Sequence, residues 1–242
     1  MTRFDGRVND QIRKTSFEGY PNFIVYPKGS VLIIQGNTKV LCNVSVRDDV
    51  PRFLMGSDRG WLTAEYNMLP FATQSRNKRE SRMGHLHGRT QEISRLIGRS
   101  LRGIFDLEKF GERSIHIDCD VIQADGGTRC ASITGSYVAL YAAIQQLLNE
   151  GYINESPITE PIAAISSGIV NDEYLLDLCY EEDSKADVDL NCIMTESRKI
   201  VEIQATAEGI PFNQDELNKL IDISWKGIQE LLQLQKEIIN YK

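Results

Sequence analysis

The chain has 242 residues, 41% of them hydrophobic, a net charge of −7 and five cysteines. This length and composition allow a sizeable core in one large or two small domains. No apolar run approaches a membrane span, and no apolar stretch follows the first residues, so we expect neither a membrane segment nor a secretory signal. The scattered, odd-numbered cysteines favour buried free thiols in a reducing cytoplasm over disulfides or a zinc site.

Charge is distributed unevenly along the chain. Residues 1–150 hold 20 Lys and Arg against 16 Asp and Glu, whereas residues 151–242 hold 7 against 18. The sharpest basic stretch is 76–102, with eight basic residues against two acidic ones. Seven of the eight are arginine, the residue best suited to binding phosphate, so this stretch predicts a polyanion-binding surface. The alternative is an ordinary solvated face.

The first part of the chain is predicted to form strands. Residues 1–21 have the character of extended chain and turns. Residues 29–35 and 38–46 are two β-rich runs separated by a Gly-Asn pair, which predicts a β-hairpin. A further strand is predicted at 60–66, and the polar, basic, aperiodic stretch 70–88 is predicted to be a mobile loop.

An amphipathic helix is predicted over residues 90–107. Its apolar stripe consists of Ile93, Leu96, Ile97, Leu101 and Ile104. Arg95, Arg99 and Arg102 recur at helical spacing on another face, and Arg89 stands just before the first turn. The helix therefore presents a row of arginines beside the basic loop.

The most informative motif is the sequence DGGTR at residues 125–129. Alternating apolar residues predict a strand over 116–123, and a helix is predicted over 131–144, ending near Gly151. Glycines allow close approach of the backbone to a ligand, and the free amides at a helix start stabilise an anion. Arg129 is suited to bind a phosphate there. The alternative is a tight turn with a surface arginine.

The second half repeats the order of strands followed by a helix. Strands are predicted at 162–170, 174–179, 190–195 and 200–204, with a turn at 171–172. A long helix is predicted from Asn213, which forms a capping box with Glu216. The pattern predicts an α+β fold without doubly wound alternation.

Acidic residues between two of these strands provide candidate metal ligands. Asp187 and Asp189 share one side of an extended chain, and Asp183 lies across the turn. Such oxygen clusters hold Mg²⁺, and one carboxyl is suited to act as a general acid. The alternative is a solvated acidic turn. His85 and His87 lack a third ligand and are interpreted as a surface pair.

Seven stretches together resemble the ribonuclease PH family of phosphorolytic 3′-to-5′ exoribonucleases, and the likeness runs from end to end. They are residues 29–32, 36–42, 50–53, 60–66, 88–102, 118–129 and 206–209. The resemblance implies one domain, 1–242, built from two similar strand-then-helix halves, roughly 1–150 and 151–242. It also implies a homohexameric ring, a trimer of dimers.

The resemblance implies an activity as well. Inorganic phosphate attacks the terminal linkage of an RNA and releases a nucleoside diphosphate, in a reversible nucleotidyl transfer. The typical substrate is the 3′ end of a tRNA precursor, within tRNA and rRNA processing. The family's phosphate ligands fall on Arg89, Gly127, Thr128 and Arg129. This agrees with the anion site inferred from the residues alone.

The resemblance also assigns acidic and RNA-binding residues. A divalent cation, Mg²⁺ or another, falls on Asp183 and Asp189, and Asp189 is the expected general acid, directly or through a metal-bound water. Asp187 remains an alternative because it is close in sequence. The family's RNA-contacting loop falls on Arg76, Lys78 and Arg79, and the helix face adds two further RNA-binding candidates. These are Arg95 and Arg99.

Two other functions remain open. A catalytically silent RNA-binding subunit of an exosome-like ring would keep the basic loop but lose Arg129 or the acidic cluster, and this chain keeps both. A hydrolytic nuclease would use water, which needs no anion cradle such as 125–129.

Overall fold

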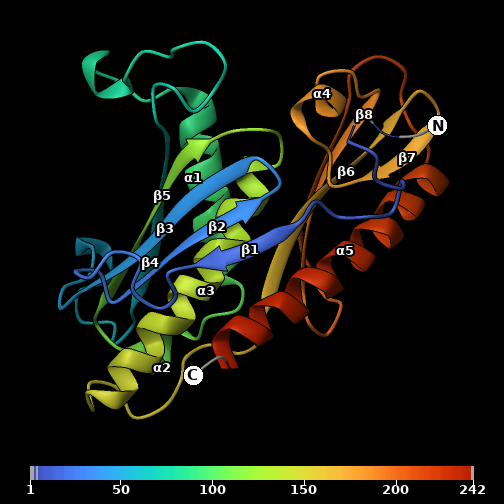
Figure 1. The fold of residues 1–242 in the computed structure, drawn as a ribbon. Coiled ribbons are helices and arrows are strands. Elements are labelled where there is room, and N and C mark those ends of the chain that lie inside the picture. The colour runs from blue at the N-terminus through green and yellow to red at the C-terminus, as the bar shows by residue number, and fades with distance from the viewer. Residues whose placement is uncertain (1–2, 4, 241–242) are drawn as a thin grey trace.

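The computed structural model describes residue 3 and residues 5–240, which form two β-sheets with helices packed on them (Figure 1). The first sheet has the strand order β1-β2-β3-β5-β4. Its strands are β1 (Thr15–Glu18), β2 (Gly29–Gln35), β3 (Thr38–Arg47), β4 (Trp61–Met68) and β5 (Ser114–Gln123). The predicted hairpin is confirmed, since Gln35 of β2 pairs with Thr38 of β3.

Two helices of the first half lie in the chain between two strands. β4 and β5 are parallel neighbours, and the chain between them forms α1 (Gly88–Arg102) and the short α2 (Leu107–Phe110). A parallel pair requires such a crossover connection, because a tight turn joins only antiparallel strands. The predicted α+β fold is therefore confirmed, with one β-α-β unit added to the strand-then-helix order.

The second sheet has the order β7-β6-β8-β9 and is antiparallel throughout. Its strands are β6 (Ile162–Val170), β7 (Glu173–Leu176), β8 (Val188–Thr195) and β9 (Ile200–Ala207). The short helix α4 (Tyr180–Asp183) precedes β8, and the long α5 (Gln214–Asn240) packs on β6 and β7 (Figure 1). Asn171 and Asp172 both have positive φ and form the predicted two-residue turn.

Helix α3 (Thr128–Asn149) joins the two halves because it packs on both sheets. Its middle is buried on every side, and the core around it includes Ile162 and Ala164 of the second half. Thr134 Oγ1 accepts a hydrogen bond from the Ala164 amide at 3.0 Å. The second turn of α3 is thereby fixed relative to β6, one strand of the other sheet.

Several predicted boundaries differ from the structure, each for a local reason. The helix predicted over 90–107 ends at Arg102, because Asp106 caps the separate helix α2 by accepting from two of its amides. Helix α3 begins at Thr128, immediately after the glycines, rather than at 131. β1 was missed because its four residues contain only one large apolar side chain.

The cysteines agree with the prediction from their number and spacing. All five cysteines are free and buried, as predicted. Within the part of the chain that the structure describes, no helix is long and apolar enough to cross a membrane.

A buried ion pair connects the start of the chain to the second half. Arg13 and Asp177 are 4% and 1% exposed, and Arg13 Nη2 lies 2.6 Å from Asp177 Oδ1. The Arg13 amide and Nε also donate to Asp177 Oδ2, at 2.7 and 3.0 Å, and Gln35 Nε2 donates to Oδ1 at 2.9 Å. Burial alone would raise the pKa of Asp177, but the charge and hydrogen bonds of Arg13 hold it below its usual value.

We expect Asp177→Asn to lower the free energy of unfolding by about 3–5 kcal/mol at pH 7, because it leaves Arg13 buried without a counter-charge. A carboxyl whose pKa is lowered by folding stabilises the fold above its unfolded pKa and loses that effect as pH falls through the folded value. The stability difference between the variant and wild type should therefore shrink when the pH falls below 3.8, the ordinary pKa of an aspartate.

Denaturant unfolding at a series of pH values measures this difference. Asp222→Asn is the matched control, because Asp222 pairs with Arg198 on the exposed face of α5 and should contribute at most about 1 kcal/mol. An equal loss of unfolding free energy in the two variants would contradict the larger contribution expected from the buried pair.

Candidate functional site

The predicted site residues from both halves line one cavity of about 380 Å³. It lies where the turn after β5 and the start of α3 meet α4 and β8. Its walls include every residue predicted to bind phosphate or to act in catalysis. These are Arg89, Gly127, Thr128, Arg129, Asp183 and Asp189.

The two glycines are required by the conformation of the turn. Gly126 and Gly127 have φ values of 75° and 65°, in the left-handed region that favours glycine. A Cβ on Gly126 would lie 2.5 Å from the Leu178 carbonyl oxygen, and one on Gly127 would lie 3.0 Å from Arg13 Nη2. Among the described residues, no side chain caps the start of α3, which leaves its first amides without a side-chain partner. These residues line the cavity, so the positive end of the helix dipole lies at the cavity wall.

Arg89 and Arg129 bring positive charge to the cavity from two helices. Arg89 lies in the first turn of α1 and is exposed. Arg129, in the first turn of α3, donates from Nη1 to Gln204 Oε1 at 2.9 Å and lies 3.8 Å from a carboxylate oxygen of Glu92. Gln204 belongs to β9, so the second sheet orients an arginine of the first half.

Thr128 brings both its backbone amide and its hydroxyl to the cavity. Its Oγ1 lies 2.9 Å from the Tyr66 hydroxyl, and both side chains are buried. Burial raises the pKa of Tyr66, which keeps its hydroxyl protonated. If the Tyr66 hydroxyl donates to Thr128 Oγ1, the Thr128 hydroxyl keeps its own proton for an anion, so both the amide and the hydroxyl of this residue are available as donors.

Two carboxyl groups with raised pKa values lie beside this cationic surface. Burial and then the charge of Asp183 raise the pKa of Asp189 to about 6, against the opposing effect of Arg129. Burial also raises the pKa of Asp183, which Arg89 and Arg129 oppose. An acid that titrates near neutrality is suited to proton transfer.

Asp187 does not share this environment. It precedes the first residue of β8, is exposed and does not line the cavity. Its amide donates to the Ile169 carbonyl, which fixes the backbone before the strand begins. The geometry therefore favours Asp189 over Asp187, the alternative that the sequence left open.

The donor set fits a magnesium ion that is held partly by its substrate. Among the described residues, no group of three or more His, Cys, Asp or Glu is placed to hold a metal. Mg²⁺ is commonly bound by one or two carboxylates together with substrate phosphates and waters, which Asp183 and Asp189 match. His85 and His87 are exposed, with ring centroids 6.1 Å apart, in line with a surface pair.

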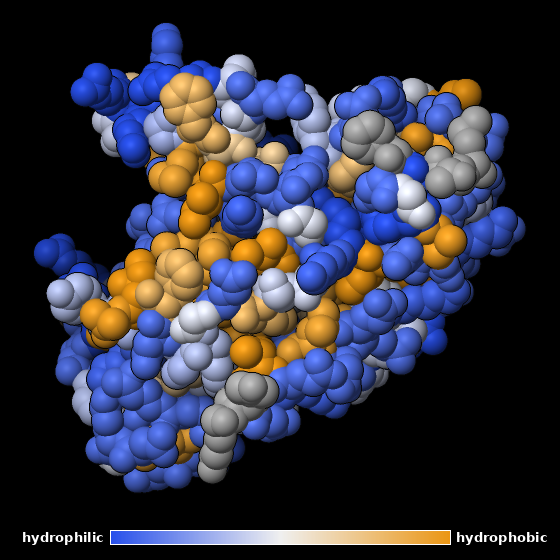
Figure 2. Space-filling view, in the orientation of Figure 1, coloured by the Kyte–Doolittle hydropathy of each residue, from blue (hydrophilic) through white to orange (hydrophobic). Residues whose placement is uncertain are grey.

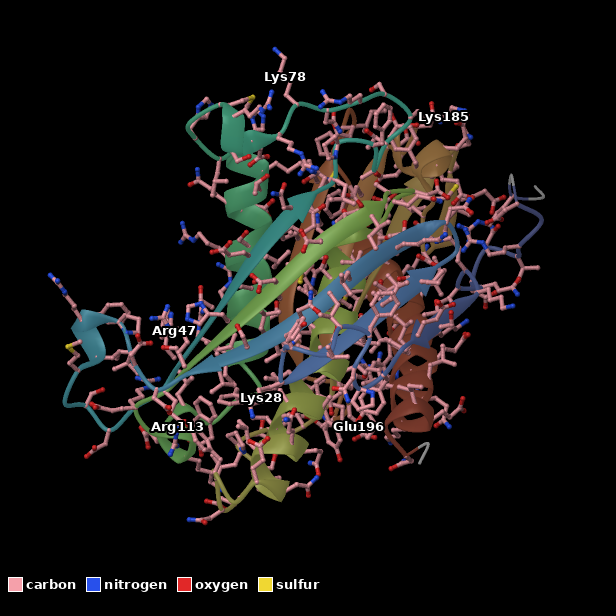
Figure 3. All side chains as sticks on the ribbon, turned by 60° about the vertical axis from the view of Figure 1, so that its left-hand side comes forward. Lys28, Arg47, Lys78, Arg113, Lys185 and Glu196 are labelled. Carbon is pink, nitrogen blue, oxygen red and sulfur yellow. The ribbon has the colours of Figure 1, made fainter. Side chains whose placement is uncertain are left out.

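The predicted RNA-binding residues lie outside the cavity. Arg76, Lys78 and Arg79 are exposed on the segment that extends past the start of α1 (Figure 1), and Lys78 points away from the body of the molecule (Figure 3). Arg95 lines a neighbouring cavity over β4 and β5. Arg99 forms an ion pair with Glu202, so its charge is already partly compensated.

Asn191, Tyr180 and Ser166 are among the cavity residues that escaped the sequence analysis. Asn191 donates from Nδ2 to Asp189 Oδ2 at 3.3 Å, and its two-residue spacing from Asp189 on one strand was a signal that could have revealed it. Tyr180, next to the acidic turn, and Ser166, on β6, also line the cavity. Ser166 reaches it only because β6 packs beside α3, which no local pattern indicates.

Comparison with known proteins identifies the group to which this chain is related. The profile of the 3′ exoribonuclease family matches residues 11–144 with its domain 1 and residues 160–227 with its domain 2. The chain belongs to the 3′ exoribonuclease family. It is 56% identical over 238 residues to "Ribonuclease PH" of Bacillus velezensis, covering 98% of this chain and 96% of that protein.

A second relative and a solved structure agree with this membership. "Ribonuclease PH" of Neisseria meningitidis is 57% identical over 234 residues, covering 97% of this chain and 96% of the relative. A chain of the Archaeoglobus fulgidus exosome with RNA bound to the active site superposes with a TM-score of 0.76 at 24% identity, covering 96% of this chain and 91% of that one. The structural likeness bears on the fold alone.

We expect Asp183→Asn to lower the pKa of Asp189 from about 6, because a like charge that disfavours the ionised form is removed while burial remains. Carbon-13 NMR of the aspartate carboxyls in metal-free buffer measures the titration. Asp187→Asn is the control that removes an exposed charge outside the cavity. An Asp189 pKa that falls equally in both variants would contradict the coupling between Asp183 and Asp189.

Proposed function

We propose that the chain is a phosphorolytic 3′-to-5′ exoribonuclease, which transfers the terminal nucleotide of an RNA reversibly to inorganic phosphate. The observation that carries the proposal is the cavity where the start of α3, Arg89 and Arg129 face two carboxyl groups of raised pKa. An anion cradle beside a proton donor suits attack by phosphate. The relatives named Ribonuclease PH support the same reaction.

In this mechanism the cradle binds the attacking phosphate. Arg89, Arg129 and the amides of Gly127 and Thr128 hold it at the start of α3. One phosphate oxygen forms a bond to the last internucleotide phosphorus, and the bond from that phosphorus to the 3′ oxygen breaks. Asp189, protonated in part near neutral pH, gives its proton to the departing 3′ oxygen. The products are a nucleoside diphosphate and a shortened RNA.

Asp183 and Asp189 would also hold a divalent cation such as Mg²⁺. The cation would supply positive charge beside the phosphates, where negative charge gathers during transfer. The environment of the two carboxyls supports this assignment, since each carries an unfavourable negative charge that a cation would compensate. Because a bound cation favours the ionised carboxylate, Asp183 would be the main ligand of the cation while Asp189 carries the proton.

The RNA would approach over the basic surface formed by Arg76, Lys78, Arg79 and Arg95, with Arg99 contributing less because of its pair with Glu202. Figure 2 shows the upper left of the molecule, where the exposed segment lies, as mostly hydrophilic. These side chains contact phosphates and carry no base specificity. The substrates would be 3′ ends of tRNA precursors and other RNAs, including rRNA precursors.

Both halves would act as one domain, since α3 and its core belong to both. The proposed location is the cytoplasm, which the five free thiols support.

The proposed assembly is a homohexameric ring, a trimer of dimers. Large apolar side chains exposed on the single chain are candidates for its interfaces. They include Phe23, Val25, Tyr26, Phe53, Met55 and Ile210.

A catalytically silent ring subunit is the weaker alternative, because Arg129, Asp183 and Asp189 are all present and line one cavity. Hydrolysis is also weaker, because an attacking water does not need the cradle at the start of α3.

Degradation of an RNA with a free 3′ end should require inorganic phosphate and yield nucleoside diphosphates. Arg89→Ala should reduce kcat/KM by roughly 100-fold or more, because a charged donor to the transferring groups is lost, while RNA binding largely survives. Product analysis with and without phosphate, together with RNA-binding titrations, measures both effects. Monophosphate products in phosphate-free buffer would contradict phosphorolysis.

The control for Arg89 is Arg47→Ala. Arg47 is an exposed arginine at the end of β3, far from the segment that carries Lys78 (Figure 3), and its loss should leave both activity and RNA binding unchanged. If Arg89→Ala weakened RNA binding as much as turnover, its role as a phosphate ligand would be wrong.

We expect Asp189→Asn to abolish turnover and the response to Mg²⁺ together, while the melting temperature stays close to that of wild type. Asparagine keeps the shape of the side chain but supplies neither the proton nor the charge that a hard cation needs. Activity across a Mg²⁺ titration measures this. Asp187→Asn should behave as wild type, and an inactive Asp187→Asn with an active Asp189→Asn would reverse the assignment.

Removing the loop charges should flatten the salt dependence of RNA binding. The triple variant Arg76→Ala, Lys78→Ala, Arg79→Ala should reduce the slope of log K against log salt by about 0.7 for each lost phosphate contact. A triple alanine variant of Lys199, Lys226 and Lys236, whose charges lie in exposed ion pairs, is the control.

Sedimentation of the wild-type protein across a dilution series, measured together with RNA trimming, tests assembly. A ring brings several basic segments to one RNA, so trimming should fall when dilution dissociates it. A monomer that trims as well as the assembled form would contradict the ring.

A further inference from the structure

Two neighbouring serines on β6 face opposite sides of the sheet. Successive side chains of a strand alternate, so Ser166 shares the face of Ala164, which packs in the core that includes α3, whereas Ile165 packs in the core that includes α5. Ser167 faces α5, where its Oγ lies 2.8 Å from Ser224 Oγ. Ser166 therefore points toward the start of α3 and lines the proposed phosphate cavity.

The Ser166 hydroxyl has no partner among the residues that the structure describes. The residue is 3% exposed, and its Oγ makes no hydrogen bond. Five buried side-chain atoms of the described chain share this property, and of these only Ser166 Oγ belongs to the cavity. Buried polar groups without a partner are unfavourable and rare, so an unpaired hydroxyl at a binding site indicates a missing ligand.

The surroundings of Ser166 explain why no protein group serves it. Its cross-strand partner is Asn191, whose amide oxygen accepts from the Cys130 thiol at 3.2 Å and whose Nδ2 donates to Asp189. The position of a Cβ on Gly127 would be 3.6 Å from Ser166 Oγ, so the hydroxyl lies directly against the glycine turn. An anion held by the amides of this turn would lie beside the hydroxyl and would accept a hydrogen bond from it.

Packing alone does not require a serine here. β6 already contains alanines at 163 and 164, both completely buried. An alanine at position 166 would occupy the same space without an unpaired hydroxyl. The hydroxyl is therefore retained at an energetic disadvantage in the free protein.

We propose that Ser166 Oγ donates a hydrogen bond to the phosphate held at the start of α3. The inference rests on the proposed function and deepens it, by adding a ligand from the second half of the chain to those on α1 and α3. A neutral hydroxyl bonded to a charged oxygen gives a short and comparatively strong hydrogen bond. In the reverse reaction the same hydroxyl binds the terminal phosphate of a nucleoside diphosphate, because that phosphate occupies the same cradle.

Ser166→Ala tests the proposal, with Ser167→Ala as the matched control. Ser166→Ala should raise the KM for inorganic phosphate by about 10- to 100-fold, the range for loss of a hydrogen bond to a charged group, with the KM for RNA nearly unchanged. The KM for nucleoside diphosphate in the reverse reaction should rise in parallel. Ser167→Ala should leave both phosphate constants at the wild-type value while lowering the melting temperature, since it removes the partner of Ser224.

Melting temperatures measured without RNA, with and without inorganic phosphate, separate phosphate binding from folding. Without RNA, inorganic phosphate should raise the melting temperature of wild type and of Ser167→Ala, and much less that of Ser166→Ala. Without phosphate, Ser166→Ala should melt no lower than wild type, because it removes an unpaired hydroxyl. If Ser166→Ala does not fold, Ser166→Cys, which keeps the size but is a weak donor, should show the same rise in the phosphate KM.

A phosphate KM within about twofold of wild type in the folded variant would overturn the assignment of Ser166, since a lost hydrogen bond to a charged group has a larger effect. That outcome differs from failure of the proposed function, in which wild-type activity itself would not depend on phosphate. Equal rises in Ser166→Ala and Ser167→Ala would also overturn it, because they would report a general disturbance of β6.

Discussion

The buried pair of Arg13 and Asp177 is the interaction on which the site depends. Asp177 accepts three hydrogen bonds from Arg13 and one from Gln35, and the remaining Arg13 nitrogen, Nη1, donates to the Asp125 carbonyl. Buried ion pairs add little net stability, because removing two charges from water is unfavourable. The value of this pair lies in geometry, since it fixes the glycine turn against the loop that leads into α4.

Once the turn is fixed, neither half of the chain forms the cavity alone. The amides and Arg129 come from α3, whereas Asp183, Asp189 and Ser166 come from the second half. Gln204 of β9 orients the Arg129 side chain, so even a ligand of the first half depends on the second sheet. Arrangement of a site across two packed sheets gives rigidity, because each side chain is held by an element with its own core.

Local patterns predicted the parts of this structure that depend on neighbouring residues. The hairpin around Gly36, the apolar stripe of α1 and the glycine turn before α3 all follow from spacing and turn residues. Contacts between distant segments were not predictable. The pairing of Arg99 with Glu202 and the placement of Ser166 each depend on how the two halves pack. The resemblance supplied Asp183 and Asp189 for the same reason, since periodicity alone favoured Asp187 equally.

The uneven distribution of charge along the sequence places opposite charges on opposite sides of this cavity. Its acidic groups come from the half with the strong negative excess, and its arginines from the other half. Asp189 already has a pKa of about 6, because burial and Asp183 outweigh Arg129. In the proposed mechanism, a bound phosphate would bring further negative charge and neutralise the arginines that favour ionisation, so it would raise the pKa of Asp189 further. Phosphate and proton uptake would thereby be linked, and the bound nucleophile would favour the protonated acid that the leaving 3′ oxygen requires.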